Sequence, residues 1–261
     1  MQIPNFMTEE GSILYKNTVG KVISPKVAEF VIAKTAKLFS TDIQHVLDVA
    51  CGPGTVSLHL AEQYPDKQFT GIDASAAMIQ QCLDTAKLKG LKNTEFLEMN
   101  ANTIQFPDRT FDFIICNLAF PFFSRPKESM EGMYHVLKRR GTILVSVPGR
   151  NTWKEFFLVA EEVLGDSIPF AKPFLSKFDQ AETLPISMTE AGFTIVEQTG
   201  HKIPFTFANG QAVLRFFQEL FSLLSYAPEE IRNEISETID KKFPSGFTMH
   251  YEAVVVQCTH P

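Results

Sequence analysis

The sequence has little cysteine and no long apolar run, and each shortage excludes a class of protein. No uncharged apolar stretch is long enough to cross a bilayer, and the N-terminus MQIPNFMTEEGS lacks the basic residues and apolar core of a signal peptide. None of the four cysteines forms a Cys-x-x-Cys pair or stands at zinc-ligand spacing from a histidine: Cys51, Cys82, Cys116 and Cys258. We therefore expect a cytoplasmic protein with no membrane span and no bound metal.

Positive charge is also in deficit, with 24 Lys and Arg against 30 Asp and Glu, a net charge of -6 and a pI of about 5.6. A mildly acidic chain does not attract phosphate backbones, so nucleic acid is a poor candidate partner and a small molecule a better one. Phenylalanine, in contrast, is abundant, with 24 residues against 5 Tyr and 1 Trp. Some of these rings must fill a core, and the excess also hints at an apolar substrate pocket.

Short apolar strands alternate with helical segments over the first half of the chain. We expect strands at 45–49, 68–72, 94–98, 111–116 and 142–147, with helices at 55–64, from 75 and at 130–137 between them. The stretch 111–116 is nearly all apolar, which is typical of a strand buried on both faces. The alternation predicts an α/β fold with a Rossmann-like doubly wound sheet.

The elements outside this alternation are more helical. The N-terminal part, 1–40, reads as helical, with a helix start at Ser24-Pro25, and the basic run 138–140 before Gly141 predicts a helix end. Beyond Pro148 we expect helices at 153–164, 183–191, 211–225 and from Pro228, and strands at 193–198 and 247–259. We interpret 1–261 as one domain: a core at 41–149, then a segment at 150–261 that completes the sheet and carries inserted cap helices at about 153–178 and 209–243.

The run VLDVACGPGT joins the first strand to the next helix, in the crevice where open α/β sheets bind ligands. Gly52 and Gly54 allow a ligand to approach the backbone closely, and the helix starting at Thr55 points free N–H groups at the same place. Asp48, just before the glycines, would repel a pyrophosphate but attract a cation such as an amino-acid ammonium. The run therefore predicts a ligand site that favours positive charge.

A second acidic residue adds a ribose to this prediction. Asp73 ends the second strand, where a carboxylate accepts two hydrogen bonds from a ribose diol. The dinucleotide fingerprint G-x-G-x-x-G fails because Ser57 replaces its third glycine, and there is no P-loop. A ligand with a ribose, a positive charge and no phosphate is required, and S-adenosylmethionine (SAM) has these properties.

Three runs in order resemble the motifs of class I SAM-dependent methyltransferases: VLDVACGPGT, GIDASAAMI and NANTIQFPDRTFDFIICNLAF. With the following LKRRGTILVSVPG they cover roughly residues 43–147. Within the family, the chain is most similar to the small-molecule type that acts in ubiquinone and menaquinone biosynthesis. The resemblance implies a seven-stranded sheet, mostly parallel with an antiparallel final strand. It also implies SAM as cofactor, S-adenosylhomocysteine as product, and methyl transfer to a small metabolite, which the excess of phenylalanine suggests is apolar or aromatic.

The resemblance also implies roles for individual residues. It places Asp48, Ala50, Gly52 and Gly54 around the methionine part of SAM. Asp73 is placed at the ribose, with the cofactor-site residue Ala74 after it, and Met78, Asn100 and Ala101 are placed beside the adenine. Asn117 and Leu118 are placed near the sulfonium, and Tyr15 is expected to close over the cofactor. Phe120, Phe122 and Phe123 follow the fourth strand and are predicted to form a wall of the substrate site.

Two positions depart from the family pattern. Ala50 stands where a glycine is most frequent, and Asn100 stands where aspartate is commoner. These departures keep open a non-catalytic SAM-binding or scaffold protein. A nicotinamide-dependent oxidoreductase on the same fold is a second alternative, and an RNA methyltransferase is a third that the acidic charge disfavours. The sequence identifies no general base.

Overall fold

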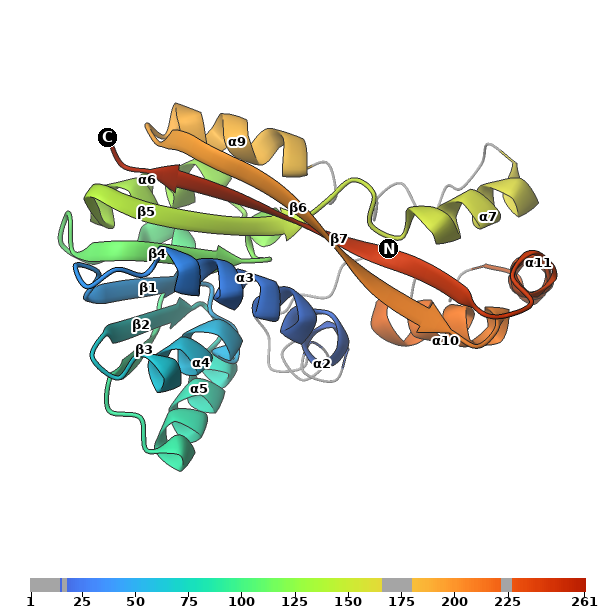
Figure 1. The fold of residues 1–261 in the computed structure, drawn as a ribbon, viewed down its shortest axis with the longest axis horizontal. Coiled ribbons are helices and arrows are strands. Elements are labelled where there is room, and N and C mark those ends of the chain that lie inside the picture. The colour runs from blue at the N-terminus through green and yellow to red at the C-terminus, as the bar shows by residue number, and fades with distance from the viewer. Residues whose placement is uncertain (1–14, 16–17, 166–179, 222–226) are drawn as a thin grey trace. The chain divides into compact units, whose positions relative to one another are not determined.

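The computed structural model describes Tyr15 and residues 18–165, 180–221 and 227–261 (Figure 1). The chain divides into two compact units. The sheet unit contains Pro4–Val147, Gln180–Gly200 and Val254–Pro261, and the helical unit contains Met1–Ile3, Pro148–Asp179 and His201–Ala253. The organisation predicted from the sequence, one domain with inserted cap helices, stays a prediction.

The sheet has seven strands in the order β3-β2-β1-β4-β5-β7-β6 (Figure 1). The first five pair in parallel, and β7 runs antiparallel to β5, as expected for the fold. This confirms the predicted fold class. The strands are β1 (His45–Val49), β2 (Gln68–Asp73), β3 (Thr94–Glu98), β4 (Phe111–Asn117), β5 (Leu137–Pro148), β6 (Thr194–Phe207) and β7 (Phe247–Thr259).

Helices cover both faces of the strands in the sheet unit. Helix α2 (Val19–Val22) precedes α3 (Ser24–Leu38), which contacts α4 (Thr55–Gln63), and α4 contacts α5 (Ala76–Lys89); α6 (Pro126–Val136) contacts α9 (Gln180–Glu190) (Figure 1). In β4, Ile114 packs in one core cluster with Met130 of α6, whereas the ring of Phe113 meets Phe39 at the end of α3, 5.3 Å between centroids. Since neighbouring strand residues point to opposite faces, β4 is buried on both sides, as its apolar sequence predicted.

The helical unit contains α7 (Lys154–Leu164), α10 (Gly210–Phe221) and α11 (Glu229–Lys242), and α11 contacts the other two. Its centre is aromatic. Trp153 is fully buried, and four rings surround it at centroid distances of 5.1 to 6.0 Å: Phe205, Phe216, Phe217 and Tyr251. Part of the phenylalanine excess therefore fills the core of this unit. Of the predicted cap helices, 166–178 and 222–226 lie outside the described residues.

Two predicted boundaries are wrong. The helix expected to end with the basic run at 138–140 ends at Val136, and the run belongs to β5. Arg140 donates its N–H to His260 O, and His260 donates to Gly141 O, so two residues of β5 oppose the one residue that follows β7, in a β-bulge with Arg140 at φ 62°. Pairing next to β7 thus makes residues 138–140 part of a strand and not of a helix. The second wrong boundary is that of β6, which extends beyond the predicted 193–198 to Phe207.

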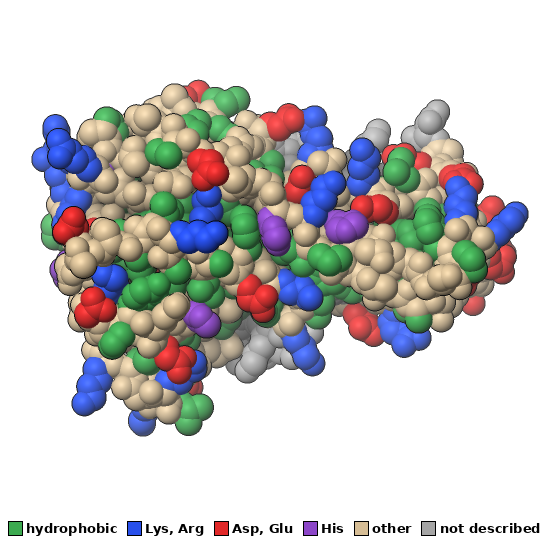
Figure 2. Space-filling view, in the orientation of Figure 1, with side chains coloured by type: hydrophobic (Ala, Val, Ile, Leu, Met, Phe, Trp, Pro, Cys, Tyr) green, Lys and Arg blue, Asp and Glu red, His purple; other side chains and the backbone are tan. Residues whose placement is uncertain are grey.

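The surface shown in Figure 2 carries Lys and Arg interspersed with Asp and Glu. A continuous basic band of the kind that follows a phosphate backbone does not cross this face. Among the described residues, every helix is too short or too polar to span a bilayer.

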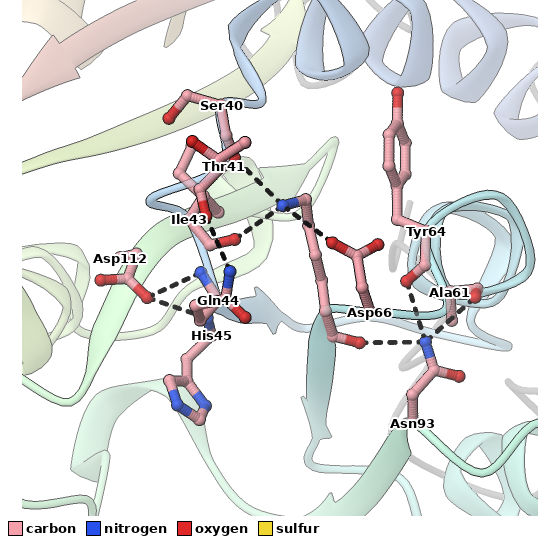
Figure 3. Close-up of polar contacts among 11 residues, drawn as sticks. Ser40, Thr41, Ile43, Gln44, His45, Ala61, Tyr64, Asp66, Asn93 and Asp112 are labelled. Carbon is pink, nitrogen blue, oxygen red and sulfur yellow. Dashed lines mark hydrogen bonds and ion pairs between the residues drawn. The ribbon is translucent and has the colours of Figure 1, made fainter.

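A polar network ties together the loops at the amino ends of β1 and β2 (Figure 3). The Asn93 amide nitrogen lies 3.0, 3.1 and 3.0 Å from the carbonyl oxygens of Ala61, Tyr64 and Lys67. The buried Lys67 ammonium donates to Ser40 O and Ile43 O at 3.0 and 2.8 Å. The network satisfies buried carbonyls at the edge opposite the glycine turn, so its role is structural.

Replacing Asn93 with alanine is expected to lower the free energy of unfolding by about 3 kcal/mol, because buried carbonyls would lose their donor. Urea denaturation followed by circular dichroism measures the change. Gln80→Ala, which removes only an exposed bond to Asp84, serves as the control and should stay within about 0.5 kcal/mol of the parent. Equal effects of the two substitutions would contradict a structural role for Asn93.

Candidate functional site

The turn between β1 and α4 contains three residues in the left-handed conformation: Ala50 at φ 55°, Gly52 at φ 55° and Gly54 at φ 79°. A Cβ at Gly52 would meet no atom within 4 Å, so open space lies beside this backbone. A Cβ at Gly54 would lie 2.8 Å from Leu58 Cδ1 and 3.0 Å from Cys82 Sγ, so only glycine lets α4 and α5 pack here. The sequence signal of these two glycines therefore has two different physical causes.

Ala50 adopts a backbone conformation that favours glycine. Its φ of 55° brings its Cβ close to the following carbonyl oxygen, at a cost of about 1–2 kcal/mol. The family's usual glycine would remove this strain, which gives the departure noted in the sequence a structural consequence. The turn nevertheless forms with Ala50 in this conformation.

Ala50→Gly is expected to raise the free energy of unfolding by about 0.5–1 kcal/mol, because relief of strain exceeds the extra entropy that glycine gives the unfolded chain. Denaturant titration measures the gain. Ala77→Gly, in the first turn of α5, is the matched control and should destabilise the protein by about 0.5–1 kcal/mol. A loss of stability in both variants would mean that Ala50 is not strained.

Asp48, in β1, is a buried carboxylate whose Oδ2 atom has no hydrogen-bond partner among the described residues. Burial raises its pKa from 3.8 to about 7; the nearby hydroxyl and N–H of Ser57 oppose the shift, and the charge of Asp73 adds to it. A buried, unsatisfied acceptor costs free energy, so its presence points to a ligand. The matching ligand group is a cation that also donates hydrogen bonds.

Asp73 is held by the backbone on both sides. Its Oδ2 accepts from Gly52 N and its Oδ1 from Ser75 N, each at 2.9 Å. Burial raises its pKa, and these two N–H groups oppose the shift. Since each carboxylate oxygen has a second lone pair, Asp73 can still accept two hydrogen bonds from a diol. The bond to Gly52 also fixes Asp73 relative to the glycine turn.

A pocket opens where these elements meet, with about 300 Å³ of empty space that is partly open to solvent. It brings together five of the predicted cofactor residues and five that were not predicted. The predicted ones are Tyr15, Asp48, Ala50, Gly52 and Asn117; the others are Ser24, Cys51, Pro53, Thr55 and Val56. Except for Ser24, the residues that sequence reasoning missed belong to the glycine turn or to the start of α4, so the motif itself could have identified them.

The far wall of the pocket is formed where β4 ends. Asn117 is the last residue of β4, and its partner in register on β5 is the buried Ser146. Ser146 Oγ donates to Asn117 Oδ1 at 2.6 Å and accepts from Leu118 N at 3.0 Å. Leu118 is held at φ 58°, and its N–H also reaches Ser146 O at 3.0 Å. Ser146 therefore fixes both predicted residues, and no sequence motif marked it.

The remaining predicted cofactor residues lie outside the lining of this pocket. Gly54 is the N-cap residue just before α4, Ala74 lies in the bend between β2 and α5, and Met78 is buried in α5. Asn100 precedes the short helix η1 (Ala101–Thr103), and its Oδ1 accepts from Asn102 N at 2.9 Å. The roles predicted for them at the ribose and adenine stay predictions.

The three phenylalanines predicted as a substrate wall have different environments. Phe120 is buried in the main core cluster, and Phe123 packs against it with ring centroids 6.0 Å apart. Phe122, which ends the short helix η2 (Phe120–Phe122), is 52% exposed. Phe120 therefore has a core role, and the wall stays a prediction. Within the described residues, no three His, Cys, Asp or Glu side chains gather as metal ligands.

Comparison with known proteins gives consistent findings. The family described as "Methyltransferase domain" matches residues 40–192. Malonyl-[acyl-carrier protein] O-methyltransferase of Paenibacillus sp. is 23% identical over 253 residues, 91% of this chain and 90% of that protein. Demethylmenaquinone methyltransferase of Listeria monocytogenes is 29% identical over 174 residues, 60% of this chain and 73% of that protein.

A solved structure shares the fold over nearly the same length. The YcgJ protein of Bacillus subtilis superimposes with a TM-score of 0.58 and 18% identity, covering 90% of this chain and 98% of that one. At this identity the likeness concerns the fold and not the substrate.

Proposed function

The chain belongs to the class I SAM-dependent methyltransferases, and from this premise we propose that it methylates a small, apolar or aromatic metabolite with SAM bound in the pocket beside Asp48. Membership of the family implies the use of SAM. The observation that carries the binding site is the buried Asp48 Oδ2, which has no hydrogen-bond partner among the described residues. The ammonium of an amino acid supplies both the charge and the donors that this atom lacks.

The residues of this site fit SAM in further respects. The open space beside Gly52 accommodates a ligand against the backbone. Asp73 keeps two lone pairs for the ribose diol, and its two backbone hydrogen bonds hold it in place. Met78, Asn100 and Ala101 would contact the adenine, and Tyr15 would close over the cofactor.

When bound, SAM supplies a methyl group activated by its sulfonium charge. The protein therefore has to align the acceptor behind that methyl group and exclude water. Asn117 lines the pocket where we place the acceptor, Leu118 follows it in the chain, and Ser146 holds both of them in a fixed geometry. A fixed wall of this kind restricts the approach of the acceptor.

The acceptor is proposed as apolar or aromatic because Phe122 and Phe123, which are only partly buried or exposed, closely follow Asn117 in the chain. The two relatives are named for different acceptors, malonyl-acyl carrier protein and demethylmenaquinone. Their likeness supports methyl transfer without selecting one acceptor.

Calorimetric titration of the purified protein with SAM and, separately, with NADH tests the proposal. We expect micromolar binding of SAM and no binding of NADH, followed by transfer of labelled methyl from SAM to a member of a panel of aromatic and lipid-like acceptors. Binding of NADH alone would establish the oxidoreductase alternative. Binding of SAM without transfer to any acceptor would favour the non-catalytic alternative, and binding of neither would refute the proposed site.

A further inference from the structure

The amide group of Asn117 has a defined orientation because Ser146 forms a hydrogen bond with one of its two polar atoms. The Ser146 hydroxyl accepts the Leu118 N–H at 3.0 Å, so its own proton is free to be donated elsewhere. It lies 2.6 Å from Asn117 Oδ1. That distance is ordinary for an O–H···O bond and too short for an N–H···O bond. The amide oxygen therefore faces Ser146.

The consequence is that the other end of the amide is left for a ligand. Asn117 is half-buried and lines the pocket, and its Nδ2 atom has no hydrogen-bond partner among the described residues. Ser146 is almost completely buried, at 1% exposure, so its side of the hydrogen bond is shielded from competing water. The pocket thus presents an N–H donor at the carboxyl end of β4.

We infer that Ser146 holds Asn117 so that its N–H donors receive the methyl acceptor as an oxygen anion, such as a carboxylate, phenolate or enolate, and not as an amine. The inference rests on the proposed function and adds the class of acceptor atom. Asn117 is the residue that contacts the acceptor, and Ser146 is a positioning residue that acts through it.

The chemistry of the transfer agrees with this assignment. An electron pair of the acceptor oxygen forms the new O–C bond while the C–S bond breaks, and the bonding pair stays on sulfur. An oxygen anion becomes a neutral ether or ester, so no proton has to be removed. An amine would gain a positive charge and need a base, and its N–H groups would face the N–H groups of Asn117 without an acceptor between them.

Two matched probes distinguish these classes by binding alone. At about pH 8, 4-nitrophenol is largely an anion, and 4-nitroaniline is a neutral amine of nearly the same shape. We would titrate each into the protein saturated with S-adenosylhomocysteine by calorimetry. We would also follow the Asn117 side-chain signals by NMR on protein labelled with ¹⁵N-asparagine. We expect nitrophenolate to bind at least about tenfold more tightly, the difference that one charge-assisted hydrogen bond makes, and to shift these signals.

Variants of Asn117 and Ser146 then test whether these two residues cause the preference for nitrophenolate. Asn117→Asp replaces the donor by a negative charge, and Ser146→Ala releases the amide, so each should weaken nitrophenolate binding, by about tenfold and about threefold. Ser146→Thr keeps the hydroxyl and should restore the affinity. Ser129→Ala is the matched control. It removes another buried Ser–Asn hydrogen bond, Ser129 Oγ to Asn102 Oδ1 at 2.8 Å, outside the pocket, and should leave nitrophenolate binding unchanged.

The Kd of SAM separates this inference from the proposed function. If Ser146→Ala weakens the binding of SAM as much as that of nitrophenolate, Asn117 serves the cofactor and the inference is overturned. Tighter binding of nitroaniline, or nitrophenolate binding without a shift of the Asn117 signals, also overturns it, as does failure of both probes to bind. Failure of SAM itself to bind the parent protein would refute the proposed function, and the inference with it.

Discussion

Asp48→Asn is expected to stabilise the protein by about 2–4 kcal/mol at pH 8 and to weaken its binding of SAM at least about tenfold. The two effects have one cause. The carboxylate is buried and its Oδ2 has no partner among the described residues, so its charge destabilises the ligand-free protein. The same charge strengthens the binding of a cationic ligand. Asparagine keeps the shape and removes the charge.

The stability difference should depend on pH in a defined direction. Folding raises the pKa of Asp48 from 3.8 to about 7, so the folded protein holds a proton that the unfolded chain releases between these values. The parent protein therefore loses stability relative to Asp48→Asn as pH rises from about 4 to about 7, and the difference disappears below about pH 4. Urea denaturation of both proteins at pH 4, 6 and 8 measures this.

Asp84→Asn, on the exposed side of α5, serves as the control and should change neither stability nor SAM affinity appreciably. The Kd of SAM for the parent protein should also weaken below pH 7, because Asp48 must lose its proton to pair with an ammonium. A variant that is less stable than the parent at pH 8 would falsify the assignment of an unsatisfied charge to Asp48.

Asp73→Ala is expected to weaken SAM binding at least about a hundredfold, since two charge-assisted hydrogen bonds of about 1.5–3 kcal/mol each would be lost from the ribose. Calorimetry gives the Kd. The substitution also removes the acceptor of Gly52 N and Ser75 N, so the glycine turn loses one of its anchors. Both consequences act in the same direction on the cofactor.

Asp73→Asn and a thermal melt accompany this measurement. The amide retains one acceptor for the backbone and should keep the fold while losing most of the affinity. If Asp73→Ala binds SAM as tightly as the parent protein, the ribose does not lie at Asp73. If both variants melt far below the parent, the effect on binding reflects the turn and not a contact with the cofactor.

The positions of the first strands and of the glycine turn could be predicted from the sequence because their causes are local. The strand at 45–49 and the strand at 94–98 have the predicted bounds, since a short apolar run is buried wherever the sheet places it. Gly52 and Gly54 could be read from the motif because a left-handed backbone favours glycine in any context. Asp48 and Asp73 followed from their places at strand ends.

The errors arose where distant segments compete with a local signal. Lys138, Arg139 and Arg140 have the composition of a helix end, yet pairing with β4 and β7 draws them into β5, since buried strand pairing outweighs a terminal charge preference. The difference between Phe120 and Phe122 is of the same kind and is not an error of prediction: only the packed core decides that Phe120 is buried and Phe122 exposed, and the substrate wall stays a prediction. Such choices depend on neighbours that the linear sequence does not show.

The sequence by itself determined the fold class, the family and the residues of the glycine turn, because each depends on short-range pattern or spacing. Only the tertiary structure decided that Asp48 has an unsatisfied oxygen, that Ala50 is strained and that Ser146 orients Asn117. The last pair is 29 residues apart in the chain and meets because β4 and β5 are neighbours in register. A polar group's partners, and hence its pKa and its direction, are set by strand pairing and burial, which come into existence only when the chain folds.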